Sequence, residues 1–238
     1  MNRIFIVVML CLMGGIFNTK VQAQDVRIDD ANNQVESLDR LTFEFTYADF
    51  LNKPEGMKTK WYNRGVNVYY NYNIYIDKNK HVAFSPGLGI SSQNVYSNSR
   101  HYLADNDSTA FAVIDGNLSY RNNKLALTYL EAPMELRFSS NADKMNRKFK
   151  FALGIRLGYL MNIHSKYRGD EYDASNSLVV VKEKDARIPN VSKVRFSPSV
   201  RIGYGSVNLV ASYAMPLFDQ DKGPQMNLLM IGVSFNTF

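Results

Sequence analysis

The chain has 238 residues, with 28 Lys and Arg against 22 Asp and Glu, a formal net charge of +6 and a mean hydropathy of -0.27. Its single cysteine excludes a disulfide scaffold, and its basic residues form no run of the kind that a nucleic-acid surface needs. The mean hydropathy is typical of a soluble protein. A membrane barrel also fits, because only every other residue of its strands must be apolar.

The first 23 residues have the layout of a secretory signal peptide. A basic start precedes an almost wholly apolar run from Ile4 to Phe17, and Val21-Gln22-Ala23 fits the small-residue cleavage rule. The apolar run is short for a transmembrane helix. We expect cleavage after residue 23, which would remove Cys11. Residues 24–39 are polar and acidic without a clear period, and we expect them to form a periplasmic lead-in.

From residue 40 onward, apolar and polar residues alternate. The pattern recurs in eight stretches, which are 41–47, 66–76, 82–91, 128–138, 149–161, 194–204, 207–215 and 229–235. A period of two residues indicates β-strands, and no stretch shows the period of an amphipathic helix. Most of these stretches reach the ~9–11 residues that a tilted transmembrane strand requires.

The two faces of these strands differ in a way that favours a barrel over a soluble sandwich. The apolar face is rich in Tyr, Phe, Leu, Ile and Val. The other face mixes Asn and a few charges with small residues, including Gly87, Gly89, Gly154, Gly158 and Gly203. Such glycines suit the cramped interior of a small closed barrel. The 15 tyrosines suit aromatic girdles at two membrane interfaces, and Trp61 with Tyr62 is expected to mark the outer one.

The connections between the stretches alternate in length. The short ones lie at 77–80, 139–148 and around 205, and the long ones at 48–62, 93–124, 164–190 and 217–225. Outer-membrane barrels have short periplasmic turns and long outer loops. Residues 40–238 are therefore predicted to be all-β, forming an eight-stranded antiparallel up-and-down transmembrane β-barrel with both ends in the periplasm.

The polar face carries charges that would lie inside the predicted barrel. They are Glu44, Glu131, Glu135, Arg137, Arg156, Arg195 and Arg201. Eight strands leave an interior that side chains fill, and a buried carboxylate is tolerable only when it is paired. We therefore expect an ion-pair network that plugs the lumen, and a symmetric fourth turn would place Glu131 opposite Arg156. The alternative is a catalytic or conducting site in the lumen.

Two segments resemble a known family. "LTYLEAPMELRF", which ends at Phe138, and "FKFALGIRLGYLMN", which begins at Phe149, are similar to the PorT-like outer-membrane β-barrel family over about residues 40–238. The resemblance implies an outer-membrane barrel in a Gram-negative envelope, and the family's namesake serves a protein-secretion apparatus. The final residue is Phe, as the insertion signal of such barrels favours, but Phe238 shares the parity of Ser234 and Asn236.

The sequence offers few catalytic constellations. Of three histidines, His81 lies beside a short turn, His101 lies in a long loop and His164 lies at the outer end of the fifth stretch. His164-Ser165 suggests a lipid-modifying enzyme at the outer rim, although the sequence places no partner acid beside it. We expect no catalytic residue, no metal and no cofactor.

The sequence thus predicts a non-enzymatic small outer-membrane barrel with a side-chain-plugged lumen. It would act in envelope structure, secretion-apparatus assembly or surface interaction through its loops. The expected partners are outer-membrane lipid, lipopolysaccharide and envelope proteins, with no nucleic acid. The alternatives are the lipid-modifying enzyme and a soluble secreted lipocalin-like binding protein, against which the charged inward face argues.

Overall fold

The structure is a computed structural model that describes residues 40–145, 147–172, 177–186 and 188–236. The predicted signal peptide, the predicted lead-in and Phe238 lie outside these residues. No helix that could span a membrane occurs in the described part of the chain. The strands are β1 (Leu41–Leu51), β2 (Arg64–Asn71), β3 (Ile74–Tyr75), β4 (Val82–Tyr96), β5 (Ser99–Leu103), β6 (Thr109–Val113), β7 (Tyr120–Ser139), β8 (Phe149–Tyr172), β9 (Leu178–Asp185), β10 (Val194–Tyr204), β11 (Val207–Pro216) and β12 (Asn227–Asn236).

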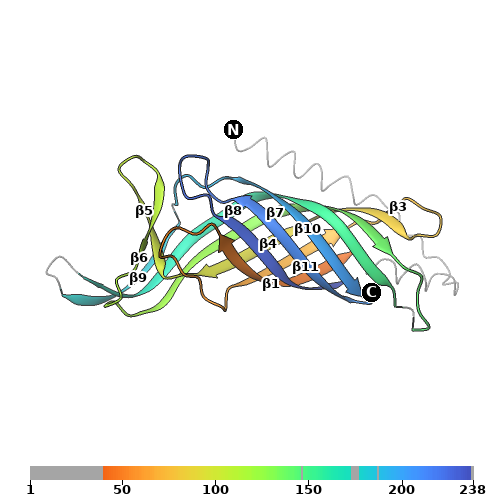
Figure 1. The fold of residues 1–238 in the computed structure, drawn as a ribbon, viewed down its shortest axis with the longest axis horizontal. Helices are drawn as coiled ribbons and strands as arrows, with labels where there is room; N and C mark the ends of the chain where they lie inside the picture. Colours follow the sequence, from red (N-terminus) through yellow and green to blue (C-terminus); the bar gives the residue numbers. More distant parts are fainter. Residues whose placement is uncertain (1–39, 146, 173–176, 187, 237–238) are drawn as a thin grey trace, which may run out of the picture. The chain divides into compact units, whose positions relative to one another are not determined.

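Eight of these strands close into a ring in which every pair is antiparallel (Figure 1). The order around the ring is β1, β2, β4, β7, β8, β10, β11 and β12, and β12 pairs with β1 to complete it. Strand β3 pairs with β4 near the end of β2, β9 pairs with β8, and β5 and β6 form a separate hairpin. The prediction of an eight-stranded antiparallel up-and-down barrel is confirmed.

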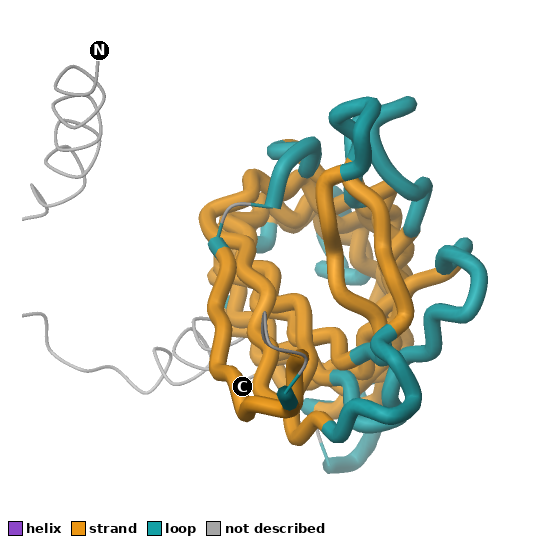
Figure 2. Tube along the Cα trace, turned by 90° about the vertical axis from the view of Figure 1, so that its left-hand side faces the viewer, coloured by secondary structure: helices purple, strands orange, loops and turns teal. Residues whose placement is uncertain are grey.

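The two ends of the ring differ, as the connection lengths predicted. One end, here called the short-turn end, carries the turns that follow β3, β7 and β10. The other, the long-loop end, carries β5, β6 and β9 (Figure 1). Figure 2 views the ring from the long-loop end. Two predicted loops are wrong in part, because 93–124 contains the β5–β6 hairpin and the start of β7, and 164–190 contains the end of β8 and all of β9.

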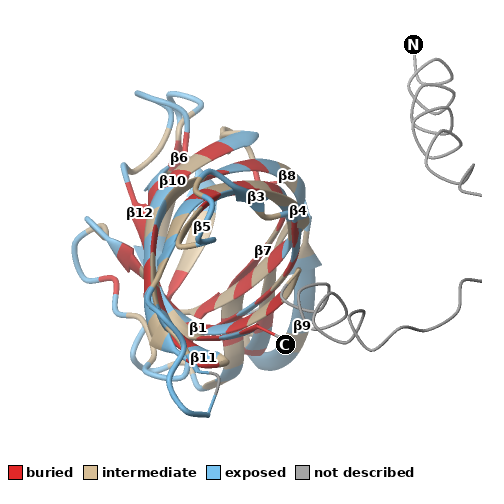
Figure 3. Cartoon of the chain, turned by 90° about the vertical axis from the view of Figure 1, so that its right-hand side faces the viewer, coloured by how far each residue is buried: buried red, intermediate tan, exposed pale blue. Residues whose placement is uncertain are grey.

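The outward and inward faces of the ring are the two faces seen in the sequence. Outward apolar side chains are exposed, such as Leu88 at 57%, Tyr159 at 53% and Leu209 at 62%. Inward polar side chains are buried, including Glu44 and Asn67 at 0%. In Figure 3, buried positions alternate with more exposed ones along the strands of the ring. This arrangement is inside out relative to a soluble protein and is typical of a barrel surrounded by lipid.

Glycines on the inward face allow the strands and lumenal side chains to approach closely, as predicted. A Cβ atom on Gly89 would lie 2.0 Å from the carbonyl oxygen of Val68 and 2.6 Å from the ring of Tyr69. A Cβ atom on Gly154 would lie 2.6 Å from the carbonyl oxygen of Met134. Gly89 therefore makes room for the Tyr69 ring inside the barrel.

Replacing Gly89 by alanine should reduce stability, because the new methyl group would collide with backbone and displace the Tyr69 ring. Overpacking of this kind costs about 1–3 kcal/mol. Urea unfolding of the protein in detergent solution would measure this loss of stability. Gly116→Ala is the matched control, since no heavy atom lies within 4 Å of its Cβ position. An equal loss in both variants would mean that the close approach at Gly89 is not the cause.

Candidate functional site

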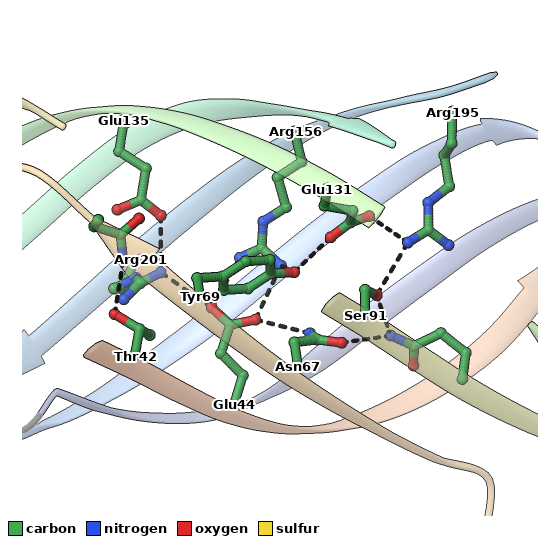
Figure 4. A network of polar contacts seen from close by, with 12 residues as sticks. Thr42, Glu44, Asn67, Tyr69, Ser91, Glu131, Glu135, Arg156, Arg195 and Arg201 are labelled. Carbon is green, nitrogen blue, oxygen red and sulfur yellow. Dashed lines mark hydrogen bonds and ion pairs between the residues drawn. The ribbon is translucent and has the colours of Figure 1, made fainter. Parts of the chain in front are cut away.

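The lumen near the short-turn end holds a network of buried charges, which centres on Glu44 of β1 (Figure 4). The Nη1 and Nη2 atoms of Arg156 lie 2.9 and 3.0 Å from the two carboxylate oxygens of Glu44. Arg201 Nη2 also donates to Glu44, at 3.0 Å, and Asn67 donates at 2.9 Å. One carboxylate thus compensates parts of two guanidinium groups in a site that excludes solvent.

From Arg201 the network continues toward the short-turn end. The same Nη2 atom lies 2.8 Å from a carboxylate oxygen of Glu135, and Arg137 Nε lies 2.9 Å from the other oxygen. Arg137 Nη1 then donates to the side-chain oxygen of Asn73 at 2.9 Å. Both oxygens of Glu135 are therefore occupied by cations from two different strands.

A tyrosine joins this part of the network to the remaining pair. The Tyr69 hydroxyl accepts a hydrogen bond from Arg156 Nη1 at 3.2 Å and donates one to Glu131. Glu131 forms an ion pair with Arg195, which also donates to Ser91 at 3.1 Å (Figure 4). The structure therefore connects all seven charges that the sequence placed in the lumen. Sequence reasoning missed Tyr69 as the link, although Tyr69 shares the parity of two inward asparagines.

The predicted partner of Glu131 is wrong. In the β7–β8 ladder Glu131 lies opposite Gly158, and Arg156 lies opposite Pro133. In this hairpin Ser139 pairs with Lys150. Each residue of β7 near the turn therefore faces a β8 residue that is two positions further along the chain than the predicted symmetric turn would give. A shift of two residues keeps every side chain on the same face but changes its neighbours. Glu131 consequently reaches Arg195 of β10, and Arg156 reaches Glu44 of β1.

A second, apolar layer of buried side chains lies in the lumen toward the long-loop end. It lies on the inward parity of the same strands and beneath the loops, and comprises Ala48, Phe50, Met57, Val95, Leu125, Leu127, Tyr129, Ile188, Ala214, Leu217, Phe218, Met226, Leu228 and Met230. The Arg195 guanidinium lies 3.8 Å from the centroid of the Tyr129 ring and joins the two layers. The sequence hinted at this layer at Leu125-Ala126-Leu127, where both parities of β7 become apolar.

The predicted rim residues do not form a joint site. His164 and Ser165 are consecutive residues of β8, so their side chains point to opposite faces of the strand. Ser165 lines a cavity of about 70 Å³ together with His101 and Asp185, and His101 Nε2 lies 3.2 Å from Asp185 Oδ2. No hydrogen bond joins Ser165 to His101 within the described ranges. Nor do the described residues include a group of three or more His, Cys, Asp or Glu side chains arranged to hold a metal.

The β5–β6 hairpin is fixed to the β8–β9 hairpin by ion pairs. Arg100 of β5 lies 3.1 Å from Glu171 and also pairs with Glu183. Its guanidinium lies 4.5 Å from the centroid of the Tyr167 ring. Together with the His101–Asp185 contact, these interactions build an ordered platform from the two hairpins at the long-loop end (Figure 1).

Comparison with known proteins gives a domain family and two distant structural likenesses. No curated protein matches the chain. The crystal structure of Ail, the attachment invasion locus protein of Yersinia pestis, in complex with the heparin analogue sucrose octasulfate, is 11% identical. The match covers 82% of this chain and 95% of that chain, with a TM-score of 0.30. A structure described as "Asymmetric conductivity of engineered proteins" is 12% identical over 82% and 97% of the two chains, with a TM-score of 0.21.

The family assignment rests on a domain model and agrees with the closed ring and its lipid-type exterior. The model for the outer membrane protein beta-barrel domain matches residues 22–219, which is most of the chain. The same residues contain ring strands β1 to β11 and both hairpins of the platform. This chain belongs to the outer membrane protein beta-barrel domain family.

Proposed function

We propose that the protein is a non-enzymatic surface-interaction protein, in which a plugged barrel anchors the platform outside the cell. The long-loop end would face the exterior, and the short turns would face the periplasm. A signal peptide over residues 1–23, cleaved on export, would deliver the chain to the outer membrane. The barrel itself would neither conduct ions nor carry out chemistry.

The observation that carries this proposal is the apolar surface of the platform. Tyr102 and Leu103 on β5, Val113 on β6, and Leu178 and Val180 on β9 are large apolar side chains that remain exposed, Val180 at 76%. They lie on hairpins beyond the strands of the ring, where lipid does not explain their exposure. Exposed apolar side chains on an ordered polar scaffold are typical of protein interaction surfaces.

The burial of side chains in the lumen supports the non-conducting part of the proposal. The charged network and the apolar layer come from strands all around the ring, and Arg156, Glu44, Phe50 and Leu127 are each at most 1% exposed. A pore would need a continuous aqueous path between these side chains. The arrangement instead suits a rigid anchor in which buried charges fix the positions of the strands.

Membership of the PorT-like branch is also a proposal, and it is based on the sequence resemblance around Tyr129–Pro133. Within it, the platform would contact other envelope or secretion proteins. The lipid-modifying alternative receives less support, since His164 and Ser165 lie on opposite faces of β8.

A photo-crosslinking amino acid placed at Tyr102 tests the proposed function in intact cells. We expect discrete adducts with another envelope protein, because Tyr102 is 50% exposed on the platform. The matched control is the same amino acid at Leu209, which is 62% exposed on the outward face of the ring and should contact only lipid. Absence of protein adducts from Tyr102, Leu103 and Val180 alike would overturn the proposal.

A further inference from the structure

The β7–β8–β9 sheet carries a row of like charges above the lipid-facing part of the barrel. Lys124 of β7 lies opposite Lys166 of β8, and Lys166 lies opposite Lys184 of β9. In a neighbouring row, Arg168 lies opposite Lys182. Like charges placed directly opposite each other in a sheet are destabilising unless an opposite charge covers them. These five residues are called the basic face below.

A β-bulge in β8 places this face on the outside of the molecule. Thr128 pairs with Asn162 and Tyr129 pairs with Leu160, so Met161 is an extra residue in β8. Before the bulge, odd-numbered residues such as Tyr159 point outward. After the bulge the even-numbered residues do so, which turns Lys166 and Arg168 outward. Bulges characteristically re-aim side chains in this way.

The acidic residues of the same hairpin are occupied on the opposite face. Glu171 and Glu183 pair with Arg100, and Asp185 contacts His101. Asp170 has the outward parity, but its carboxylate accepts a hydrogen bond from the Ser119 amide at 3.3 Å. Glu171, Glu183 and Asp185 of the hairpin thus face β5, while the bases face outward together with the single carboxylate of Asp170.

Little within the described residues neutralises the basic face. Lys166, Arg168, Lys182 and Lys184 form no ion pair or side-chain hydrogen bond with any described residue. Lys124 Nζ donates to the neutral Asn94 at 2.6 Å. His164 lies on the same outward side, and its pKa is lowered by burial and by the charges of Lys184, Lys124 and Lys166. Burial makes the largest contribution to this lower pKa, and the three lysine charges act in the same direction.

The position of the basic face along the barrel indicates its ligand. On β8 it begins at Lys166, a few residues beyond the exposed apolar residues Tyr159 and Met161, which we take as the end of the lipid-facing surface. Trp61, Tyr62 and Tyr96 form an aromatic cluster, in which the ring centroid of Tyr62 lies 5.8 Å from that of Trp61 and 4.9 Å from that of Tyr96. The cluster lies beside Lys124, whose Nζ is 5.7 Å from the Tyr96 ring centroid. Tryptophan and tyrosine are enriched at the headgroup level of membranes.

We propose that the basic face binds the phosphate groups on the saccharide headgroup of the glycolipid in the outer leaflet. Phosphate oxygens would accept charge-assisted hydrogen bonds from Lys166, Arg168, Lys182 and Lys184, and would relieve the repulsion between opposed rows. Each basic residue near an anionic membrane surface contributes to binding, and the attraction is screened by salt. This inference depends on the outer-membrane family and not on the proposed protein partner, so either can fail alone.

The single tryptophan of the chain offers a probe, because Trp61 lies in the aromatic cluster beside Lys124. Purified full-length protein in a zwitterionic detergent should show a saturable change in Trp61 fluorescence when lipopolysaccharide is added. Lipopolysaccharide without its lipid phosphates should bind far more weakly. Converting Lys166, Arg168, Lys182 and Lys184 together to glutamine should weaken binding by several hundred-fold, because each Lys or Arg near an anionic surface strengthens binding by about fivefold.

A control variant carries the same loss of charge elsewhere. Lys58, Lys78, Lys144 and Lys222 are exposed, and their joint conversion to glutamine should leave binding within about twofold of the wild type. Equal weakening in both variants would show that net charge alone attracts the lipid, and would overturn the site. Saturation of the Trp61 signal by inorganic phosphate alone would likewise overturn the glycolipid assignment. So would a variant with the four glutamines that no longer binds a soluble sulfated polysaccharide but still binds lipopolysaccharide as the wild type does.

Discussion

Replacing Glu44 by glutamine will lower the free energy of unfolding by about 3–5 kcal/mol, the scale on which breaking one side of a buried ion pair destabilises soluble proteins. Glu44 is 0% exposed and receives hydrogen bonds from Arg156 and Arg201. Glutamine has nearly the same volume, so the change isolates the charge from the packing. Arg156 would keep only neutral acceptors, the side-chain oxygen of the new glutamine and the Tyr69 hydroxyl.

Urea unfolding of the barrel folded in detergent would measure this loss. The folded fraction can be read from unheated gels, in which folded barrels migrate faster than unfolded chains. Glu55→Gln is the matched control, because Glu55 is an exposed loop residue and exposed pairs contribute about 0–1 kcal/mol. A Glu44→Gln loss of less than about 1 kcal/mol would mean that water in the lumen screens Arg156, contrary to a filled interior.

A double-mutant cycle will show strong coupling between Glu131 and Arg195. Glu131→Met alone should cost about 3–5 kcal/mol, because it leaves the Arg195 guanidinium buried without its carboxylate. Adding Arg195→Met should recover much of that loss, since a buried pair replaced by apolar residues of similar size is often neutral. The Tyr69 hydroxyl and Ser91 lose a partner in the double variant, so recovery should be incomplete.

The same cycle with Arg156 in place of Arg195 is the informative comparison. Arg156 reaches Glu131 only through the Tyr69 hydroxyl, and its direct partner is Glu44. Coupling between Glu131 and Arg156 should therefore be the weaker of the two. If Arg156 couples to Glu131 more strongly than Arg195 does, the network is arranged as a symmetric turn would have placed it, and the register of β7 and β8 is different.

The sequence alone predicts the ring and the face of each lumenal charge, because lipid outside and polar groups inside impose a strict two-residue period. Glu131 illustrates both the reach and the limit of that signal. Its parity identifies the lumen, but its partner depends on where the β7–β8 turn closes, and a slip of two residues leaves the parity unchanged. Partners across a barrel therefore require the register, which alternation does not contain.

Strand β9 was missed for a different reason. Its last four residues are Lys182, Glu183, Lys184 and Asp185. They keep a period of two in the sign of their charge, but all four are polar, so their hydropathy does not alternate. The bases face outward and the acids face β5, so both faces are polar and no apolar alternation marks the strand. The apolar layer of the lumen escaped for the converse reason. Leu125 and Leu127 occupy the parity of β7 that carries Glu131, Glu135 and Arg137 nearer the short-turn end.

Single-channel recording in planar bilayers provides the most decisive test that the lumen is filled and the barrel acts only as an anchor. The wild-type protein should insert and show no discrete conductance steps at neutral pH, because on this proposal the charged network and the apolar layer close the ring from within. A general porin inserted into the same bilayer would confirm that steps are detectable. Reproducible steps from the wild-type protein would contradict the plugged lumen and would identify the network around Glu44 as the lining of a pore.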